Sequence, residues 1–213
     1  MSMPSVPPVG CVIMASGQAT RFGSNKLLAE FGGRPLIARA LEVSRTPALA
    51  CRVLVTRWPE VARLGREAGV ETVLHSLPGR NDTVRLGLEA LLARCPGLAG
   101  CIFLPGDQPL LRQPSLEAMV QAFAAPGRGQ KETEQGIFRL GCRADTGPGP
   151  LLGSPVLFGS AYFSALLTLP QGKGGGAILQ QHPQKVQPVL TPCPQELLDA
   201  DTPQGLAELE KWL

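Results

Sequence analysis

Hydrophobic residues recur along this chain in two alternating patterns. The first is a short, continuous apolar run, typical of a strand that is buried on both faces of a parallel sheet. The second repeats every three or four positions, typical of a helix with one buried face. The apolar runs lie at residues 9–15, 52–56, 71–74, 100–104, 136–140, 155–158 and 186–190. The helical pattern covers residues 35–44, 60–68, 83–94, 115–125, 160–169, 173–181 and 203–213.

This regular alternation predicts a doubly wound α/β fold with a mostly parallel sheet. Periodicity is lost between residues 125 and 153, where proline and glycine are dense. That stretch is either a strand flanked by two flexible loops or a linker between domains. We favour the first interpretation, because the chain that follows is too short to fold richly by itself. We therefore expect a flexible tail at residues 1–8 and a single domain at residues 9–213.

The loop after the first strand contains residues suited to an anionic ligand. The strand ends at Ser16 and Gly17, and the next apolar pattern starts at Leu27. Between them lie small polar residues, a second glycine and the cations Arg21 and Lys26. Such a loop presents backbone N–H groups at the carboxyl edge of the sheet, where α/β proteins bind ligands. Polyphosphate is the ligand that fits best, although an ordinary solvated connection has the same composition.

The two common phosphate-binding motifs do not match this loop. Gly17 and Gly23 are six positions apart and no lysine follows Gly23 directly, which excludes G-x-x-x-x-G-K-[ST]. The pattern is not G-x-G-x-x-G either, so a dinucleotide-binding oxidoreductase is a poor candidate.

Three aspartates are candidate metal ligands. Asp107 comes just after the apolar run 100–104, so in a parallel sheet it projects from the same edge as the first loop. Asp199 and Asp201 are two positions apart and therefore share one side of an extended segment. Magnesium prefers one or two carboxylates together with phosphate oxygens and water. The alternatives are that Asp107 caps a turn, and that Asp201 or Thr202 caps the last helix.

Two further segments combine glycine with polar residues at a predicted helix start. In residues 79–88, Asn81 and Asp82 are placed to cap the helix, and polar groups there could hold a ribose or a phosphate. An ordinary capped helix explains the same residues. Residues 174–176 are three consecutive glycines, which destabilise a helix interior unless the backbone must approach something closely. Lys173 beside them is either a partner for an acceptor phosphate or a solvated loop lysine.

Composition excludes several classes of protein. The 213 residues have a net charge of +3 and no dense basic run, so we expect no nucleic-acid partner. The six cysteines form no C-x-x-C pair, which favours reduced thiols and a cytoplasmic location. The two histidines have no ligand-like neighbours, which disfavours a histidine metal site. No apolar segment approaches the length of a membrane span, and residues 1–8 lack the pattern of a signal peptide.

The motifs, taken together, resemble those of the MobA-like nucleotidyltransferases. The first loop is similar to the family pattern A-[AG]-G-x-[GS]-x-R-[FM]-G-x-x-K-L, with Ser16 where the family more often has alanine or glycine. Four further stations follow in the family's order, at residues 79–88, at 104–110, at 152–158 with 171–177, and at 198–203. Within the family, the chain is most similar to the molybdenum cofactor cytidylyltransferases. Ser154 is a second departure, because asparagine or histidine is more common there.

The resemblance implies a fold and a set of residue roles. The fold is a three-layer α/β/α Rossmann-like nucleotide-diphosphosugar-transferase fold with a mostly parallel mixed sheet. The implied catalytic residues are Arg21 and Lys26, and the implied magnesium ligands are Asp107, Asp199 and Asp201. The implied nucleotide-binding residues are Ala15, Ser16, Gly17, Gln18, Asn81, Thr83, Gly87, Pro105 and Gly106. The implied acceptor-binding residues are Ser154, Pro155, Lys173 and Gly174.

The resemblance also implies a reaction. It is the Mg²⁺-dependent transfer of CMP from CTP to the phosphate of molybdopterin, with release of pyrophosphate and delivery of the product to a molybdenum hydroxylase. An acceptor phosphate is ionised near neutral pH and needs no general base, which agrees with motifs that contain cations and carboxylates but no catalytic Ser, His or Cys. The alternatives are a guanylyltransferase for the same cofactor, a cytidylyltransferase for another phosphate monoester, and a non-catalytic nucleotide- or cofactor-binding accessory protein.

Overall fold

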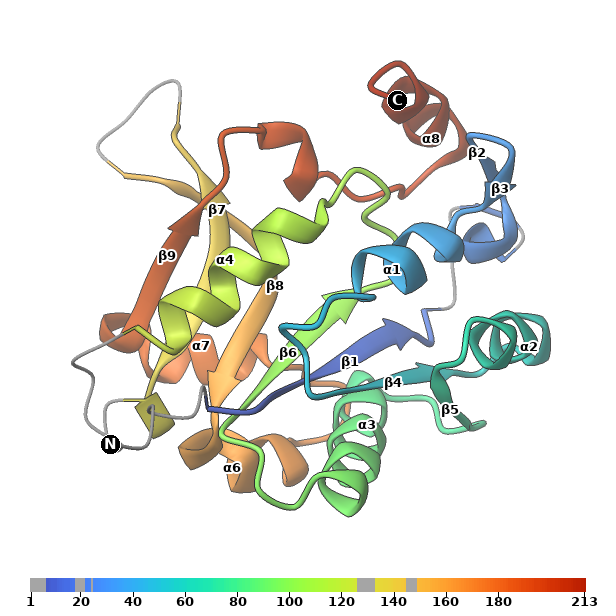
Figure 1. Cartoon of the computed structure of the whole chain (residues 1–213). Coiled ribbons are helices and arrows are strands. Elements are labelled where there is room, and N and C mark those ends of the chain that lie inside the picture. Colours follow the sequence, from blue (N-terminus) through green and yellow to red (C-terminus); the bar gives the residue numbers. More distant parts are fainter. Residues whose placement is uncertain (1–6, 18–21, 24, 126–132, 145–148) are drawn as a thin grey trace.

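The computed structural model describes residues 7–17, 22–23, 25–125, 133–144 and 149–213. Among these residues, seven strands form one sheet in the order β5-β4-β1-β6-β8-β7-β9 (Figure 1). All neighbouring strands are parallel except β8, which is antiparallel to both β6 and β7. The strands of the sheet are β1 Val9–Ala15, β4 Cys51–Thr56, β5 Glu71–Leu74, β6 Gly100–Pro105, β7 Ile137–Cys142, β8 Leu151–Gly159 and β9 Val186–Leu190.

The helices follow the predicted order closely. The α-helices are α1 Ile37–Val43, α2 Pro59–Glu67, α3 Arg80–Arg94, α4 Gln113–Phe123, α6 Phe163–Leu167, α7 Gly176–Gln181 and α8 Pro203–Glu210. Short 3₁₀ turns are η1 Lys26–Leu28, η2 Ser160–Tyr162, η3 Pro183–Lys185 and η4 Pro194–Leu197. Within the described part of the chain, none of these helices has the length and apolar character that crossing a bilayer requires.

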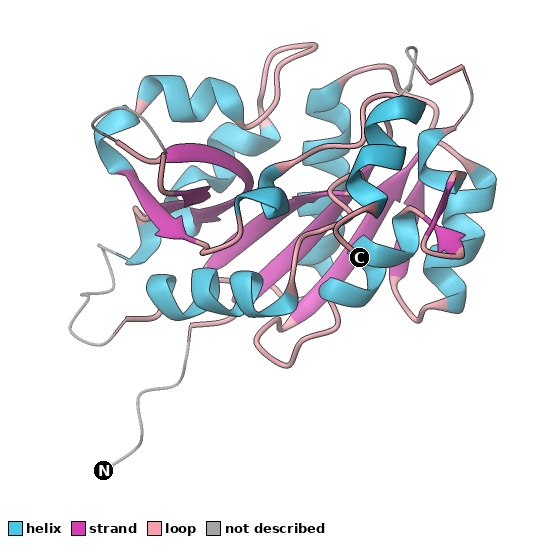
Figure 2. Ribbon diagram, turned by 90° about the horizontal axis from the view of Figure 1, so that it is seen from above, coloured by secondary structure: helices cyan, strands magenta, loops and turns pink. Residues whose placement is uncertain are grey.

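Helices cover both faces of the sheet, as Figure 2 shows from above. On one face, α1, α2 and α4 pack against strand residues such as Ile13 and Ile102. On the other face, α3, α6 and α7 pack against Val12 and Phe103. Adjacent strand residues point to opposite faces, so both faces of β1 and β6 are apolar. The predicted three-layer α/β/α fold with a mostly parallel mixed sheet is therefore confirmed.

Two local features differ from the sequence-based expectations. Helix α3 begins at Arg80, so Asn81 and Asp82 lie in its first turn and the prediction that they precede the helix is wrong. Gly79 is the capping residue, and its N–H donates to the Asp82 carboxylate at 3.0 Å. A small hairpin of β2 (Glu30–Phe31) and β3 (Arg34–Pro35) was not predicted, because two-residue strands have no detectable period. Its turn, Gly32-Gly33, has positive φ angles of 58° and 76°, for which glycine is suited.

The sheet topology opens a crevice beside β1. The chain goes from β1 to β4 and β5 on one side, and then to β6 on the other side. Strand β1 is parallel to both neighbours, with Met14 opposite Val55 and Pro105. Ligands of open α/β sheets bind outside the carboxyl ends of the strands at such a switch point.

Candidate active site

A cavity of about 770 Å³ lies at this switch point and gathers most of the predicted residues. Its walls come from the ends of β1 and β6, the start of α3, the middle of β7 and β8, the start of α7 and the segment before α8. The predicted residues that line it are Ala15, Ser16, Gly17, Lys26, Thr83, Pro105, Asp107, Ser154, Gly174, Asp199 and Asp201. Segments far apart in the chain thus meet in one place, as the predicted parallel sheet requires.

Lys26 is a cation of this cavity that contacts two carboxylates. Its Nζ lies 2.6 Å from Asp107 Oδ2 and 3.1 Å from Asp201 Oδ1, and its side chain is 12% exposed. Desolvation by itself would lower the pKa of Lys26, but the charges and hydrogen bonds of Asp107 and Asp201 outweigh it and raise the pKa. Lys26 is therefore a firmly held cation between two carboxylates that the chain places 94 residues apart.

Asp199 adds a third carboxyl group to the same wall. Desolvation, and then the negative charge of Asp107, raise the pKa of Asp199 to about 6, although the residue keeps contact with solvent. Gln108 is 3% exposed and donates to the Leu197 carbonyl at 3.4 Å, and its side chain also hydrogen-bonds Asp199. The carboxyl groups of Asp107 and Asp199 are therefore close enough to repel each other.

An ion pair between the half-exposed Arg112 and the buried Glu196 attaches the segment that carries Asp199 and Asp201 to the body of the protein. Glu196 is 1% exposed and accepts hydrogen bonds at 3.0 Å from the side chain and from the backbone N–H of Arg112. The Thr191 hydroxyl donates to the same carboxylate. Further along, the N–H of Ala200 donates to the Asp107 carbonyl at 2.9 Å. These bonds explain how two aspartates near the end of the chain face Asp107.

The donor set suits a hard divalent cation that arrives with other oxygen ligands. Carboxylate oxygens are what Mg²⁺ prefers in proteins, usually one or two of them with phosphate oxygens and water. Among the described residues, no three His, Cys, Asp or Glu side chains form a ready-made metal cage. One or two of the three aspartates could therefore hold a cation together with oxygens of a phosphate ligand.

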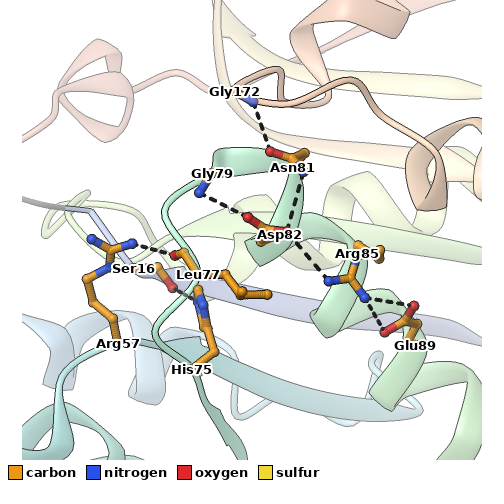
Figure 3. Close-up of polar contacts among 10 residues, drawn as sticks. All are labelled: Ser16, Arg57, His75, Leu77, Gly79, Asn81, Asp82, Arg85, Glu89 and Gly172. Carbon is orange, nitrogen blue, oxygen red and sulfur yellow. Dashed lines mark hydrogen bonds and ion pairs between the residues drawn. The ribbon is translucent and has the colours of Figure 1, made fainter.

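Ser16 makes contacts that an alanine or glycine at this position lacks. Its Oγ donates to the Val55 carbonyl at 3.2 Å and lies 2.8 Å from His75 Nε2 (Figure 3). Burial, followed by the charge of Arg57, lowers the pKa of His75. The ring is therefore neutral at neutral pH and anchors the first loop to the end of β5. No local motif around His75 indicates this contact, because Ser16 lies 59 residues earlier in the chain.

Some predicted residues lie outside the cavity wall. Gly87 is buried in α3, and a Cβ there would come within 2.4 Å of Val12, so close helix–sheet packing accounts for this glycine. Gly106 packs in the same manner against Ile37, and its N–H donates to the Met14 carbonyl. Asn81 accepts a hydrogen bond from the N–H of Gly172 at 2.9 Å (Figure 3). This bond joins α3 to the glycine-rich turn, residues 172–176.

Four further predicted residues do not line the cavity or lie outside the described part of the chain. Pro155 is buried within β8, and Lys173 is exposed beside the cavity; neither lines it. Arg21, predicted to be catalytic, and Gln18 lie outside the described residues.

The cavity is also lined by residues that were not predicted from the sequence. Arg80 at the start of α3 and Arg139 in the middle of β7 are two additional cations on the wall. Phe103, Val156 and Phe158 give the floor an apolar part. No short motif surrounds these residues, and each lies in an element whose local pattern predicts a helix or a strand and nothing more.

Comparison with known proteins agrees with this geometry. The family model described as the MobA-like NTP transferase domain matches residues 11–186. The chain belongs to this family. The match begins in β1 and extends into β9, so it includes Lys26, Asp107 and the glycine-rich turn of the MobA-like NTP transferase domain.

Two related proteins are similar over part of the chain. The bifunctional protein GlmU of Micrococcus luteus is 32% identical over 139 residues, which are 60% of this chain and 28% of GlmU. A 3-deoxy-manno-octulosonate cytidylyltransferase of Anaeromyxobacter dehalogenans is 33% identical over 121 residues, 56% of this chain and 49% of the relative. The aligned part thus spans less than half the length of either relative.

Among solved structures, Rv0371c from Mycobacterium tuberculosis H37Rv has the same fold. The TM-score is 0.74 over 96% of this chain and 98% of that chain, at 21% sequence identity. At this identity the similarity shows a shared fold and gives no information on the substrates of this MobA-like domain.

Proposed function

We propose that this MobA-like domain is a magnesium-dependent cytidylyltransferase that moves CMP from CTP to the phosphate of a molybdopterin-type acceptor and releases pyrophosphate. The observation that carries the proposal is the meeting of the first loop, Lys26 and three aspartates in one cavity at the switch point. Cations and carboxylates at one site suit a reaction in which charge moves between phosphate oxygens.

The choice of substrates has two different supports. CTP is favoured because a related protein is a cytidylyltransferase. The molybdopterin acceptor rests on the similarity of the first loop, with R-F-G-x-x-K-L, to the molybdenum cofactor cytidylyltransferases. A molybdenum hydroxylase in the cytoplasm is the proposed recipient of the product.

The chemistry asks little of the protein beyond positioning. An oxygen of the acceptor phosphate forms a bond to the α-phosphorus of CTP while the bond between the α-phosphorus and the bridging oxygen of pyrophosphate breaks. A phosphate monoester has its second pKa at about 6, so its attacking oxygen needs no base. The backbone of Ser16 and Gly17 holds the triphosphate, and Lys26 stabilises the negative charge that grows on the leaving group. Arg21 is proposed to act with Lys26.

Magnesium, held by Asp107 with Asp199 or Asp201, would neutralise charge on the phosphate oxygens when bound. Lys26 already occupies the position between Asp107 and Asp201. Its ammonium group therefore faces the region where additional anionic oxygens of a nucleotide would lie. Thr83, at the buried start of α3, and Ser154, on β8, are proposed contacts of the nucleotide and of the acceptor respectively.

The test is pyrophosphate release in the presence of magnesium, with each of CTP, GTP, ATP and UTP and with molybdopterin as the acceptor. An Asp107→Asn variant is compared with Glu89→Gln, which changes an exposed carboxylate on α3 that pairs with Arg85. We expect release with CTP that is lost in Asp107→Asn and kept in Glu89→Gln. Release with GTP instead would make the domain a guanylyltransferase.

A second acceptor distinguishes the remaining alternatives. Release with CTP and 3-deoxy-manno-octulosonate, and none with molybdopterin, would contradict the proposed acceptor and keep the proposed reaction. Tight CTP binding without release with any acceptor would favour a non-catalytic accessory protein.

A further inference from the structure

Two cations of the cavity, Arg80 and Arg139, form no ion pair with a described residue; Arg80 is exposed, whereas Arg139 is partly buried. Arg139 lies in the middle of β7, is partly buried, and lines the cavity. No carboxylate of the described chain forms an ion pair with its guanidinium group. Burial lowers the pKa of Arg139, and no charge of a described residue opposes this shift. A partly desolvated charge without a counter-ion is costly, and such groups usually serve a ligand.

Within the described part of the chain, the guanidinium group makes one hydrogen bond, to a backbone carbonyl. Its Nε donates to the Gly153 carbonyl at 2.7 Å. The β7–β8 pairing shifts register between Arg139 and Gly141, so Gly153 lies where the ladder is interrupted. Irregularities of this kind are frequent beside active sites, where they redirect a side chain. One of the five N–H groups of the guanidinium group is thus used, which fixes the plane of the group. Its two terminal nitrogens form no hydrogen bond with a described residue.

The position of Arg139 separates it from β1 and from the first loop, which follows β1. The sheet register places Val12, Phe103, Val156 and Arg139 in one row across β1, β6, β8 and β7. Three strand spacings therefore separate Arg139 from β1, roughly 14 Å. Between them, Phe103 and Val156 give the cavity floor an apolar stretch. A ligand that reaches Arg139 from the first loop must cross this stretch, as an acceptor bound beside a nucleotide would.

We propose that Arg139 anchors the acceptor by binding an anionic group of the acceptor with its two terminal guanidinium nitrogens. The inference rests on the proposed nucleotidyl transfer and adds the recognition of its second substrate. The planar fork of arginine matches the two oxygens of a phosphate or a carboxylate. The anion is either the phosphate that reacts or a second anionic group of the acceptor.

The kinetic test compares Arg139→Gln and Arg139→Lys with Arg52→Gln. Arg52 is a matched control, because it is a partly buried strand arginine that donates to a backbone carbonyl, that of Leu41, outside this cavity. We expect Arg139→Gln to raise the KM for the acceptor about 10- to 100-fold and to leave the KM for CTP unchanged. Arg139→Lys should fall between Arg139→Gln and the unaltered protein. Equal increases of both KM values, or the same increase in Arg52→Gln, would overturn the proposal.

A binding test remains valid even when no acceptor supports turnover. The Nε–H resonance of Arg139, protected by the Gly153 carbonyl, is assigned in an arginine ¹⁵N–¹H spectrum by its loss in Arg139→Lys. We expect it to shift on titration with molybdopterin and to remain in place with CTP alone. A shift with inorganic phosphate as well assigns the reacting phosphate, and a shift with molybdopterin alone assigns a second anionic group. A shift with CTP alone, or none with any of the three ligands, would show that Arg139 does not anchor the acceptor.

Discussion

The two ends of the cavity balance their charges in different ways. At the carboxylate end, formed by Lys26, Asp107, Asp199 and Asp201, an ammonium group is already paired with carboxylates at 2.6 and 3.1 Å. At the arginine end, formed by Arg139 and Ser154 beside an apolar floor, the described residues provide no carboxylate for the cation.

This difference agrees with the proposal that one cavity receives two substrates. A group of charges that pairs internally is stable without ligand and can exchange one partner for another, which suits a nucleotide that arrives with a metal ion. A cation without a protein partner gains most from an anionic ligand, which suits the recognition of an acceptor. Four variants test the contrast.

The largest effect is expected at the carboxylate end. Lys26→Gln removes the charge that faces the leaving group, and we expect kcat to fall about 100- to 1,000-fold. Lys211→Gln is the control, because Lys211 is an exposed lysine that pairs with Glu208 on α8. Steady-state pyrophosphate release measures both variants. A fall of less than about threefold in Lys26→Gln would mean that the charge of Lys26 serves the structure alone.

The attachment of the last segment tests whether the carboxylate end depends on distant contacts. Glu196→Gln removes a buried charge that accepts from Arg112 and Thr191, and we expect a loss of about 2–4 kcal/mol in the free energy of unfolding. Activity should fall as well, because the same contacts place Asp199 and Asp201. Urea unfolding measures the first effect. Glu117→Gln, which alters a partly exposed carboxylate on α4 that accepts from Thr46, should change stability far less.

Stability should depend on pH through Asp199. Folding raises its pKa from 3.8 to about 6, so the folded state binds the proton more tightly. This effect favours folding below about pH 4 and is lost as the pH rises to about 6. After a discount for solvent contact, Asp199→Asn should gain about 1–2 kcal/mol relative to the unaltered protein between pH 4 and pH 7. Unfolding curves of both proteins across this range measure the gain, and a difference independent of pH would contradict the prediction.

The smallest effect is expected at the first loop. Ser16→Ala removes the contacts with Val55 and His75, and we expect a loss of about 1 kcal/mol in stability with activity nearly unchanged. A double-mutant cycle with His75→Gln isolates the contact between the two side chains. A coupling energy near zero would mean that Ser16 and His75 stabilise the fold independently. A large loss of activity in Ser16→Ala would contradict the prediction and would mean that the Ser16 side chain acts on the substrate.

Much of the fold and of the carboxylate end could be predicted from local patterns. The runs at β1 and β6 are apolar because both of their faces are covered by helices. Their burial can therefore be predicted from a short stretch of sequence. Asp107 follows such a run, and in a parallel sheet the residue that follows a strand lies at the carboxyl edge of the sheet. The prediction of α3 was less accurate, because Asn81 and Asp82 fit a capping position as well as the first turn that they occupy.

Sequence by itself thus determined the order of elements, the parallel sheet, the edge at which ligands bind and the charged residues of the motifs. Tertiary structure alone decided which side chains meet. The antiparallel insertion of β8 brings Arg139 into the cavity, and the packing of α3 on β1 assigns Gly87 to a helix–sheet contact. The contact between Ser16 and His75 likewise depends on the position of β5 in the sheet. The physical reason is that strand order and register join residues that are distant in the chain, and no local period records these contacts.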